Sequence, residues 1–324
     1  MRHAPHDERA EPVRPVRAPT LDDLESAWQT VHSVLEPTPL VASPIAPNGS
    51  LKLETLQPTG SFKVRGGVAG VSALLQDQRA VTASAGNHGL GVAWASARLG
   101  RQATVVVPEH SSAAKLAALR TYPIELVEHG ADYEAAEKYA LELGAAEGVS
   151  FVSPYNDPFV IAGQATIGRE LDSQAPGELT VVAPVGGGGL LAGLALWARS
   201  RPGVRLVGVE SSESRGISAA VAAGHIVHVP VGDTIADGLA GNLEPGSVTV
   251  GLVAGAQLVA VDDDELRAAM RWLFANHGLV TEGSGAAGIA AVLGGKVDIA
   301  GRLVVVVTGR NIAADRFAKI LRGG

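Results

Sequence analysis

Short apolar runs alternate with longer segments of helical periodicity along most of the chain. Val105–Val107 and Val304–Val307 are apolar on both faces, as strands covered by helices on two sides must be. Strands separated by helices favour right-handed crossovers and parallel sheets, so the pattern predicts an α/β protein with parallel sheets flanked by helices. The expected strands are Leu51–Leu53, Val81–Ala83, Ala103–Val107, Ile124–Val127, Thr180–Ala183, Arg205–Val209, Leu258–Val261 and Leu303–Val307.

The first expected helix has a recognisable start. Thr20 can cap a helix, and Asp23 three residues later completes a capping-box pattern. Apolar residues then recur at helical spacing until Pro37 ends the segment. Further helices are expected over much of 64–76, 88–99, 112–120, 132–146, 158–173, 190–200, 213–223, 263–277 and 284–293.

One apolar stretch could be mistaken for a membrane span. Leu179–Ala198 carries no charge and is long enough to cross a bilayer. Pro184 and a run of four glycines interrupt it, where a backbone facing lipid could not satisfy its hydrogen bonds. We therefore expect a buried strand, a glycine turn and a buried helix, and no membrane partner.

Composition narrows the choice of partners and compartment. At roughly 150 residues per domain, 324 residues suggest about two compact units, and a charged fraction of only 18% favours a large core. The net charge of −7, with basic residues concentrated only in the N-terminal segment, argues against nucleic acid. The absence of cysteine excludes disulfides and thiolate catalysis and agrees with a cytoplasmic location. Residues 1–19 are rich in arginine and proline without an apolar core, so we expect a disordered tail there rather than a secretory signal.

The glycine run 186–189 is a candidate phosphate site. It follows an expected strand and precedes an apolar helix, and backbone N–H groups at a helix N-terminus attract anions. Four consecutive glycines cost more chain entropy than a tight turn requires. Gly187, Gly189 and Ala192 also fit G-x-G-x-x-A, with Glu210 ending the next strand. A dinucleotide site in an NAD-dependent oxidoreductase therefore stays open as an alternative.

Lys63 is a candidate nucleophile. It stands among glycines and small residues in Thr59–Gly67, just ahead of an expected helix. Poor hydration there would lower the pKa of the amine, and the neutral amine is the form that makes a Schiff base. A lone lysine is ordinarily a solvated surface group, so this interpretation depends on the neighbouring motifs.

Two further motifs follow expected strands. Ser84–Gly89 leads from a strand into a helix and offers N–H groups to a second anion, with Asn87 adding a side-chain amide. His88 is expected to contribute its backbone at the helix N-terminus rather than to act as a base. Thr308 follows Val304–Val307, at the end of a strand where parallel sheets place their ligands.

Together and in this order, the motifs resemble the fold-type II pyridoxal-phosphate (PLP) enzymes, specifically the serine/threonine dehydratase and serine racemase group. The similarity runs from Thr38 to Asn311 and includes Val160–Gln164 and Thr234–Gly238. It implies a two-lobed fold like that of the tryptophan synthase β subunit, with a small lobe over 65–151 and a large cofactor-binding lobe over 20–64 and 152–324. It also implies a homodimer.

The resemblance implies a role for each motif. Lys63 would carry the Schiff base with PLP and then act as the base at the substrate Cα, and Ser84 would hold the substrate carboxylate, both as catalytic residues. Thr308 would face the pyridine nitrogen. The implied cofactor-binding residues are Phe62, Lys63, Asn87, Gly186, Gly187, Gly188, Gly189, Gly238, Glu282 and Thr308. The implied residues for the amino-acid substrate are Ser84, Ala85, Gly86, Asn87, His88 and Tyr155.

Departures from the family pattern bear on the reaction. Ala85 stands where racemases of this group place a second serine, and Arg310 replaces a glycine that usually follows the strand-end hydroxyl. Relatives often bind a divalent cation after the strand that ends at Glu210. Here Gly216 stands near the place of a downstream acid, so a Mg²⁺ or Ca²⁺ site at Glu210, helped by Glu213, is left open.

The expected function is a PLP-dependent ammonia-lyase. It would convert a β-hydroxy amino acid such as L-threonine or L-serine to a 2-oxo acid and ammonia. An amino-acid racemase and a 3-hydroxyaspartate dehydratase are the alternatives within the family. A β-replacement enzyme of the cysteine synthase type is disfavoured because Ser61–Arg65 and Ser84–His88 do not match its motifs. An NAD-dependent oxidoreductase would leave Lys63, Asn87 and Thr308 unexplained.

Overall fold

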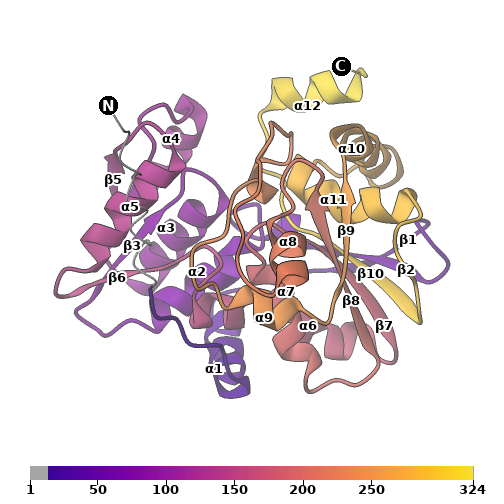
Figure 1. Cartoon of the computed structure of the whole chain (residues 1–324), viewed down its shortest axis with the longest axis horizontal. Helices are drawn as coiled ribbons and strands as arrows, with labels where there is room; N and C mark the ends of the chain where they lie inside the picture. The colour runs from indigo at the N-terminus through magenta and orange to yellow at the C-terminus, as the bar shows by residue number, and fades with distance from the viewer. Residues whose placement is uncertain (1–13, 324) are drawn as a thin grey trace, which may run out of the picture.

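The computed structural model describes residues 14–323 and contains two sheets (Figure 1). The larger sheet has the strand order β1-β2-β10-β7-β8-β9, and the smaller has the order β5-β4-β3-β6. Among the described strands, only the pair β1–β2 is antiparallel. The predicted parallel α/β fold is confirmed. The strands are β1 (Leu40–Ser43), β2 (Gly49–Leu53), β3 (Arg79–Ala83), β4 (Ala103–Val107), β5 (Glu125–Glu128), β6 (Val149–Phe151), β7 (Leu179–Pro184), β8 (Val204–Ser211), β9 (Gln257–Val261) and β10 (Arg302–Val307).

Helices cover both sheets, and most lie where the apolar periodicity predicted them. The elements that were not predicted are α9, α12, the 3-10 helices η1 and η2, and the short strands β1 and β6. The helices are α1 (Leu21–His32), η1 (Glu54–Leu56), α2 (Lys63–Ser72), α3 (Asn87–Leu99), α4 (Ala113–Leu119), α5 (Tyr133–Gly144), α6 (Pro158–Gln174), α7 (Gly189–Ala198), α8 (Gly216–Ala223), η2 (Asp237–Leu239), α9 (Thr249–Val253), α10 (Asp263–His277), α11 (Gly283–Leu293) and α12 (Ala314–Leu321).

The start of α1 is the capping box that its sequence predicted. The Thr20 hydroxyl accepts the Asp23 N–H at 3.1 Å, and the Asp23 carboxylate accepts the Thr20 N–H at 2.7 Å. Two of the N–H groups that a helix start leaves without a partner are satisfied in this way.

Strand β10 shows why both faces of the larger sheet had to be apolar. Val304 and Val306 belong to a core cluster with residues of α1, α6 and α7. Leu303, Val305 and Val307 alternate with them and belong to a second cluster with residues of α10 and α11. The sheet therefore lies between two helical layers.

The apolar stretch 179–198 divides as predicted. It forms β7, a glycine turn and α7, and Gly188 between them has φ +85°, a left-handed conformation that favours glycine. Within residues 14–323, no helix is long and apolar enough to cross a membrane.

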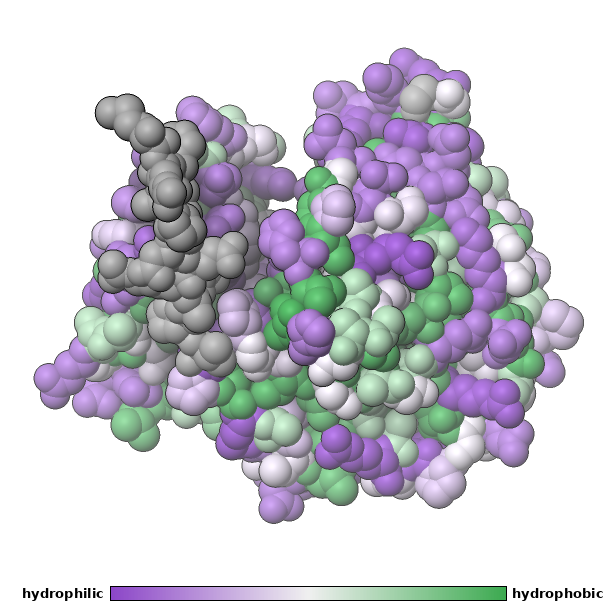
Figure 2. All heavy atoms as spheres, viewed as in Figure 1, coloured by the Kyte–Doolittle hydropathy of each residue, from purple (hydrophilic) through white to green (hydrophobic). Residues whose placement is uncertain are grey.

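The two sheets come from separate parts of the chain. The smaller sheet uses residues of 79–151, whereas the larger uses 40–53 and 179–307. Figure 2 shows a notch between the part that carries α4 and the part that carries α12. The predicted lobe boundary at 64/65 falls inside α2, a helix that packs against both α3 and α6. The lobe boundaries stay a prediction.

The predicted tail is only partly described. Residues 1–13 lie outside the described part of the chain, and residues 14–20 have no helix or strand. Arg14 nevertheless donates to Glu244 at 2.9 Å and to the carbonyl of Asn156 at 2.6 Å. The predicted tail therefore includes at least one residue that is held against the rest of the molecule.

Candidate active site

Lys63 is the first residue of α2, and its side chain is half-buried. Its ammonium group donates to the carbonyl oxygen of Pro154 at 2.7 Å and lies 5.3 Å from the centre of the Phe62 ring. Burial lowers the pKa of Lys63 to about 8, because a charged amine is poorly solvated there. The neutral form, which a nucleophile or base requires, is therefore more populated near physiological pH than in an ordinary lysine.

The start of α2 is joined to the end of β10. The Phe62 N–H donates to the Thr308 carbonyl at 3.0 Å, and Ser61 forms an isolated antiparallel bridge with Gly309. Thr308 is 3% exposed. Lys63 and Thr308 are 245 positions apart in the sequence, yet these backbone contacts hold their segments side by side at the carboxyl end of the larger sheet.

Asn87 links the smaller sheet to the larger one. Its amide nitrogen donates to Glu282 at 2.7 Å, and its amide oxygen accepts from Asn311 at 2.6 Å. Burial raises the pKa of Glu282 to about 7, opposed by the hydrogen bond from Asn87. The missing Cβ of Gly309 makes room here, since a Cβ would lie 2.1 Å from a Glu282 oxygen.

The glycine turn approaches other backbone closely enough to require glycine. A Cβ on Gly186 would lie 2.8 Å from the Gly238 carbonyl, and one on Gly187 would lie 2.4 Å from the Tyr155 ring. The Tyr155 hydroxyl accepts the Glu244 N–H at 2.6 Å, which holds the ring in place. The turn leads into the N-terminus of α7, where the first N–H groups of the helix have no intrahelical partner.

The Ser84–Gly89 turn is a second such helix start. The Ser84 hydroxyl accepts the Gly86 N–H at 3.2 Å, and α3 begins at Asn87. Ala85 is partly buried against the apolar cluster of the smaller sheet. His88 is 3% exposed and forms a 3.0 Å hydrogen bond with the Val152 carbonyl. Burial, and then the charge of Lys63, lower its pKa to about 3, so His88 is neutral and donates this bond.

Several of the predicted residues are thus linked by direct contacts. Lys63 contacts Pro154, the neighbour of Tyr155, whose ring covers Gly187. On the other side, the Phe62–Thr308 contact continues through Gly309 to Glu282 and Asn87. Gly238, although exposed, lies between Gly186 and the Ser284 hydroxyl. Sequence reasoning assigned no role to Pro154, because a carbonyl acceptor leaves no mark on residue type.

Glu210 is buried and already engaged. Its carboxylate accepts the N–H groups of Ile217 at 2.9 Å and Ser218 at 3.2 Å, and the Ser218 hydroxyl also donates to it. It therefore caps the first turn of α8. Within residues 14–323, no three His, Asp or Glu side chains gather in a way that could hold a metal ion.

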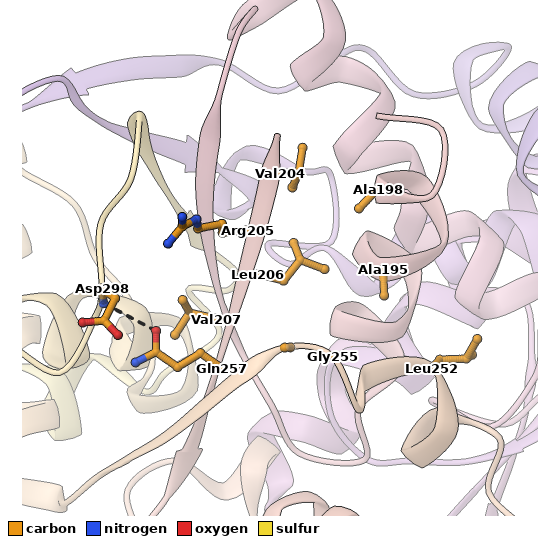
Figure 3. A pocket seen from close by; sticks show the side chains of 11 residues that line it. Ala195, Ala198, Val204, Arg205, Leu206, Val207, Leu252, Gly255, Gln257 and Asp298 are labelled. Atoms are coloured by element: carbon orange, nitrogen blue, oxygen red, sulfur yellow. Dashed lines mark hydrogen bonds between the residues drawn. The ribbon is translucent and has the colours of Figure 1, made fainter. Parts of the chain in front are cut away.

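A pocket of about 470 Å³ lies elsewhere on the larger sheet (Figure 3). It is lined by the start of β8, the end of α7 and the loop before β9. Asp298, in the loop before β10, also lines it and donates its N–H to the Gln257 side chain at 3.4 Å. Parallel sheets place their ligands at the carboxyl ends of their strands. This pocket lies at the amino end of β8, on the opposite edge of the sheet. It is not the site that contains Lys63.

Comparison with known proteins decides the family. The family model "Pyridoxal-phosphate dependent enzyme" matches residues 31–309. The chain belongs to this family. It is 37% identical over 317 residues to an L-threonine ammonia-lyase of Thermotoga maritima, covering 94% of this chain and 79% of the relative. Maize serine racemase has a similar structure, with a TM-score of 0.87, 28% identity and coverage of 95% of this chain and 98% of that one. The processed threonine deaminase isoform 2 of Solanum lycopersicum has a TM-score of 0.84, 30% identity and coverage of 97% and 93%.

The predicted fold type and the predicted PLP-dependent enzyme are thereby confirmed, and the site fits the cofactor. PLP carries one aldehyde and one phosphate, which require an amine and an anion site. Lys63 offers an amine with a lowered pKa, and the glycine turn offers N–H groups at a helix N-terminus. The NAD-dependent alternative is excluded by the family. The proposed roles of single residues stay predictions and are taken up below.

Proposed function

We propose that this PLP-dependent enzyme is an ammonia-lyase acting on a β-hydroxy amino acid such as L-threonine or L-serine, with a 2-oxo acid and ammonia as products. The observation that carries the proposal is the half-buried Lys63 amine with its lowered pKa, which donates to the Pro154 carbonyl at the start of a helix joined to the end of β10. The 37% identity to an L-threonine ammonia-lyase supports this choice of substrate class.

In the proposed reaction, each of the predicted site residues has a separate role. PLP, when bound, supplies the electron sink that stabilises negative charge at the substrate Cα. Lys63 would remove the Cα proton at Nζ, and the N–H groups of Gly187–Gly189 would hold the phosphate. The Ser84 hydroxyl and the N–H groups at the start of α3 would bind the substrate carboxylate and so orient the Cα–H bond. Loss of the β-hydroxyl as water leaves an enamine, whose hydrolysis gives the 2-oxo acid and ammonia.

Thr308 bears on the type of reaction. A neutral hydroxyl at the end of β10 would face the pyridine nitrogen, and unlike a carboxylate it does not keep that nitrogen protonated. A milder electron sink suits rapid expulsion of a β-leaving group better than a long-lived carbanion.

A substrate panel tests the proposal. The purified holoenzyme would be incubated with L-threonine, L-serine, L-threo-3-hydroxyaspartate and, as a control without a leaving group, L-alanine. We expect 2-oxo acid from at least one β-hydroxy amino acid and none from L-alanine. A protein that shows the Schiff-base absorption band but releases no 2-oxo acid from any of these substrates would contradict the proposal.

Racemisation is the second candidate, because the fold is so similar to that of maize serine racemase. Ala85 opposes it, since a methyl group cannot return a proton to the opposite face of Cα. The expected homodimer is a separate proposal, which light scattering of the purified protein would test.

A further inference from the structure

Four charged side chains are buried together behind the first turn of α2. Lys52, Glu54 and Arg65 have no exposed surface, and Glu170 is 2% exposed. Arg65 donates to Glu54 at 2.7 and 2.9 Å and to Glu170 at 2.6 Å. Lys52 also donates to Glu170 and to Gln174 at 2.8 Å. These four residues, the charge cluster, come from β2, η1, α2 and α6, and their charges balance.

Stability alone gives little reason for the charge cluster. Taking ions out of water is costly, and well-packed apolar side chains often hold elements together equally well. What the ions add is direction, because the planar Arg65 guanidinium binds carboxylates from two different elements in one geometry. Thr38 reinforces this arrangement, since its hydroxyl donates to Glu54 at 2.6 Å and its N–H donates to Glu170 at 3.1 Å.

The charge cluster is directly connected to the segments that carry Lys63 and Thr308. Arg65 lies two residues after Lys63, in the first turn of α2. Glu54 follows β2, which pairs with β10, the strand that ends just before Thr308. We infer that the charge cluster positions Lys63 relative to Thr308, an inference that rests on the proposed role of Lys63. Arg65 and its partners are positioning residues that act through α2 and touch no substrate.

The test replaces the geometry of the charge cluster while keeping its charge. Arg65→Lys retains a cation but cannot bridge both carboxylates. We expect kcat to fall by roughly 10–100-fold with little change in KM, because small displacements of a reacting group are costly. We also expect the pH midpoint of the Schiff-base absorption band to move. The matched control is Arg169→Lys, since Arg169 also pairs with two carboxylates, Asp172 at 3.1 Å and Glu25 at 3.5 Å, but its side chain is 35% exposed. It should leave both readouts unchanged.

A purely structural role would look different. Arg65→Lys would then lower the melting temperature, while the folded protein would keep the parent kcat and pH midpoint, and that result would overturn the inference. If Arg65→Lys does not fold, Thr38→Val removes the two hydrogen bonds that the Thr38 hydroxyl makes with Glu54 and Arg65, without removing a charge. It should lower kcat by roughly threefold to tenfold, and an unchanged kcat and midpoint would equally overturn the inference. Lys63→Ala separates the two proposals, because survival of the band in that variant would refute the role of Lys63 itself.

Discussion

The Lys63 ammonium group and the Pro154 carbonyl oxygen are 2.7 Å apart, in a hydrogen bond between residues 91 positions apart in the sequence. Pro154 precedes Tyr155, whose ring lies where a Cβ on Gly187 would have to be. The candidate nucleophile and the candidate phosphate turn are therefore linked through one short segment between β6 and α6.

Lys63→Ala should abolish the Schiff-base absorption band and 2-oxo acid release, since the variant has no amine at position 63. The fold should persist, because the change removes no core contact of α2, and circular dichroism would check this. Lys115→Ala is the matched control. Lys115 is exposed and pairs with Asp237 at 3.3 Å, so its loss should leave the band in place. A band that survives in Lys63→Ala would make another lysine the anchor.

The lowered pKa of Lys63 predicts how cofactor uptake depends on pH. Only the neutral amine attacks an aldehyde, and the neutral fraction rises with pH until it levels off above the pKa of about 8. The rate at which the apoprotein develops its Schiff-base band with PLP should therefore increase from pH 6, pass its midpoint near pH 8 and level off above about pH 9. Stopped-flow absorbance would measure it. A midpoint near 10.4, the ordinary value for lysine, would show that burial does not affect this amine.

Gly187→Ala should weaken PLP binding, because the added Cβ would lie 2.4 Å from the Tyr155 ring. Either the ring or the turn must move, and the N–H groups proposed to hold the phosphate move with the turn. Gly251→Ala is the control, since a Cβ there meets nothing within 4 Å. Equilibrium titration of both apoproteins with PLP should show a higher Kd for the first variant only. Equal Kd values for PLP in the two variants would show that the N–H groups of this turn do not hold the phosphate.

The engagement of Glu210 predicts tolerance of chelators. Its carboxylate already accepts the N–H groups of Ile217 and Ser218 and the Ser218 hydroxyl, and Gly216 supplies no second carboxylate. Hard divalent cations need six or more oxygen ligands, so we expect activity in excess EDTA to stay within about twofold of its starting value. A steep loss that Mg²⁺ or Ca²⁺ restores would show that Glu210, together with Glu213 or nearby carbonyls, does bind a cation.

The motifs whose places in the fold were predicted correctly share one physical property, while their roles in the reaction stay predictions. The glycine turn, Lys63, the Ser84–Gly89 turn and Thr308 all stand at a strand end or a helix start, where residue type and backbone geometry are tightly coupled. Apolar runs predicted the central strands for a different reason: a strand covered on both faces tolerates few polar residues.

The parts that sequence missed depend on tertiary contacts. The strands β1 and β6 have only four and three residues, too few for a distinct pattern, and they exist because neighbouring strands offer hydrogen bonds. The Arg65–Glu170 pair joins residues 105 positions apart, and neither residue type differs from an ordinary surface charge. Such pairs become visible only when the fold is known.

Ala85 leads to the last prediction, that elimination dominates racemisation. Inversion at Cα needs a proton donor on the face opposite Lys63, within roughly 3 Å of the carbon. The Ser84–His88 turn is the proposed neighbour of that face, and at position 85 it offers only a methyl group. A carbanion generated by Lys63 can regain its proton on the same face or lose the β-hydroxyl, and neither course inverts the centre.

Ala85→Ser should therefore raise the ratio of racemisation to 2-oxo acid formation, because it adds a proton-bearing hydroxyl with little extra volume. Ala223→Ser is a control for the substitution itself, since Ala223 is exposed at the end of α8, an element separate from the turn. Chiral chromatography and 2-oxo acid assays on the same L-serine and L-threonine incubations would give the ratio for each protein. If the parent protein inverts Cα as fast as it releases 2-oxo acid, another group supplies the second proton. The protein would then be a racemase that also eliminates, because racemisation and elimination would compete equally for the same carbanion.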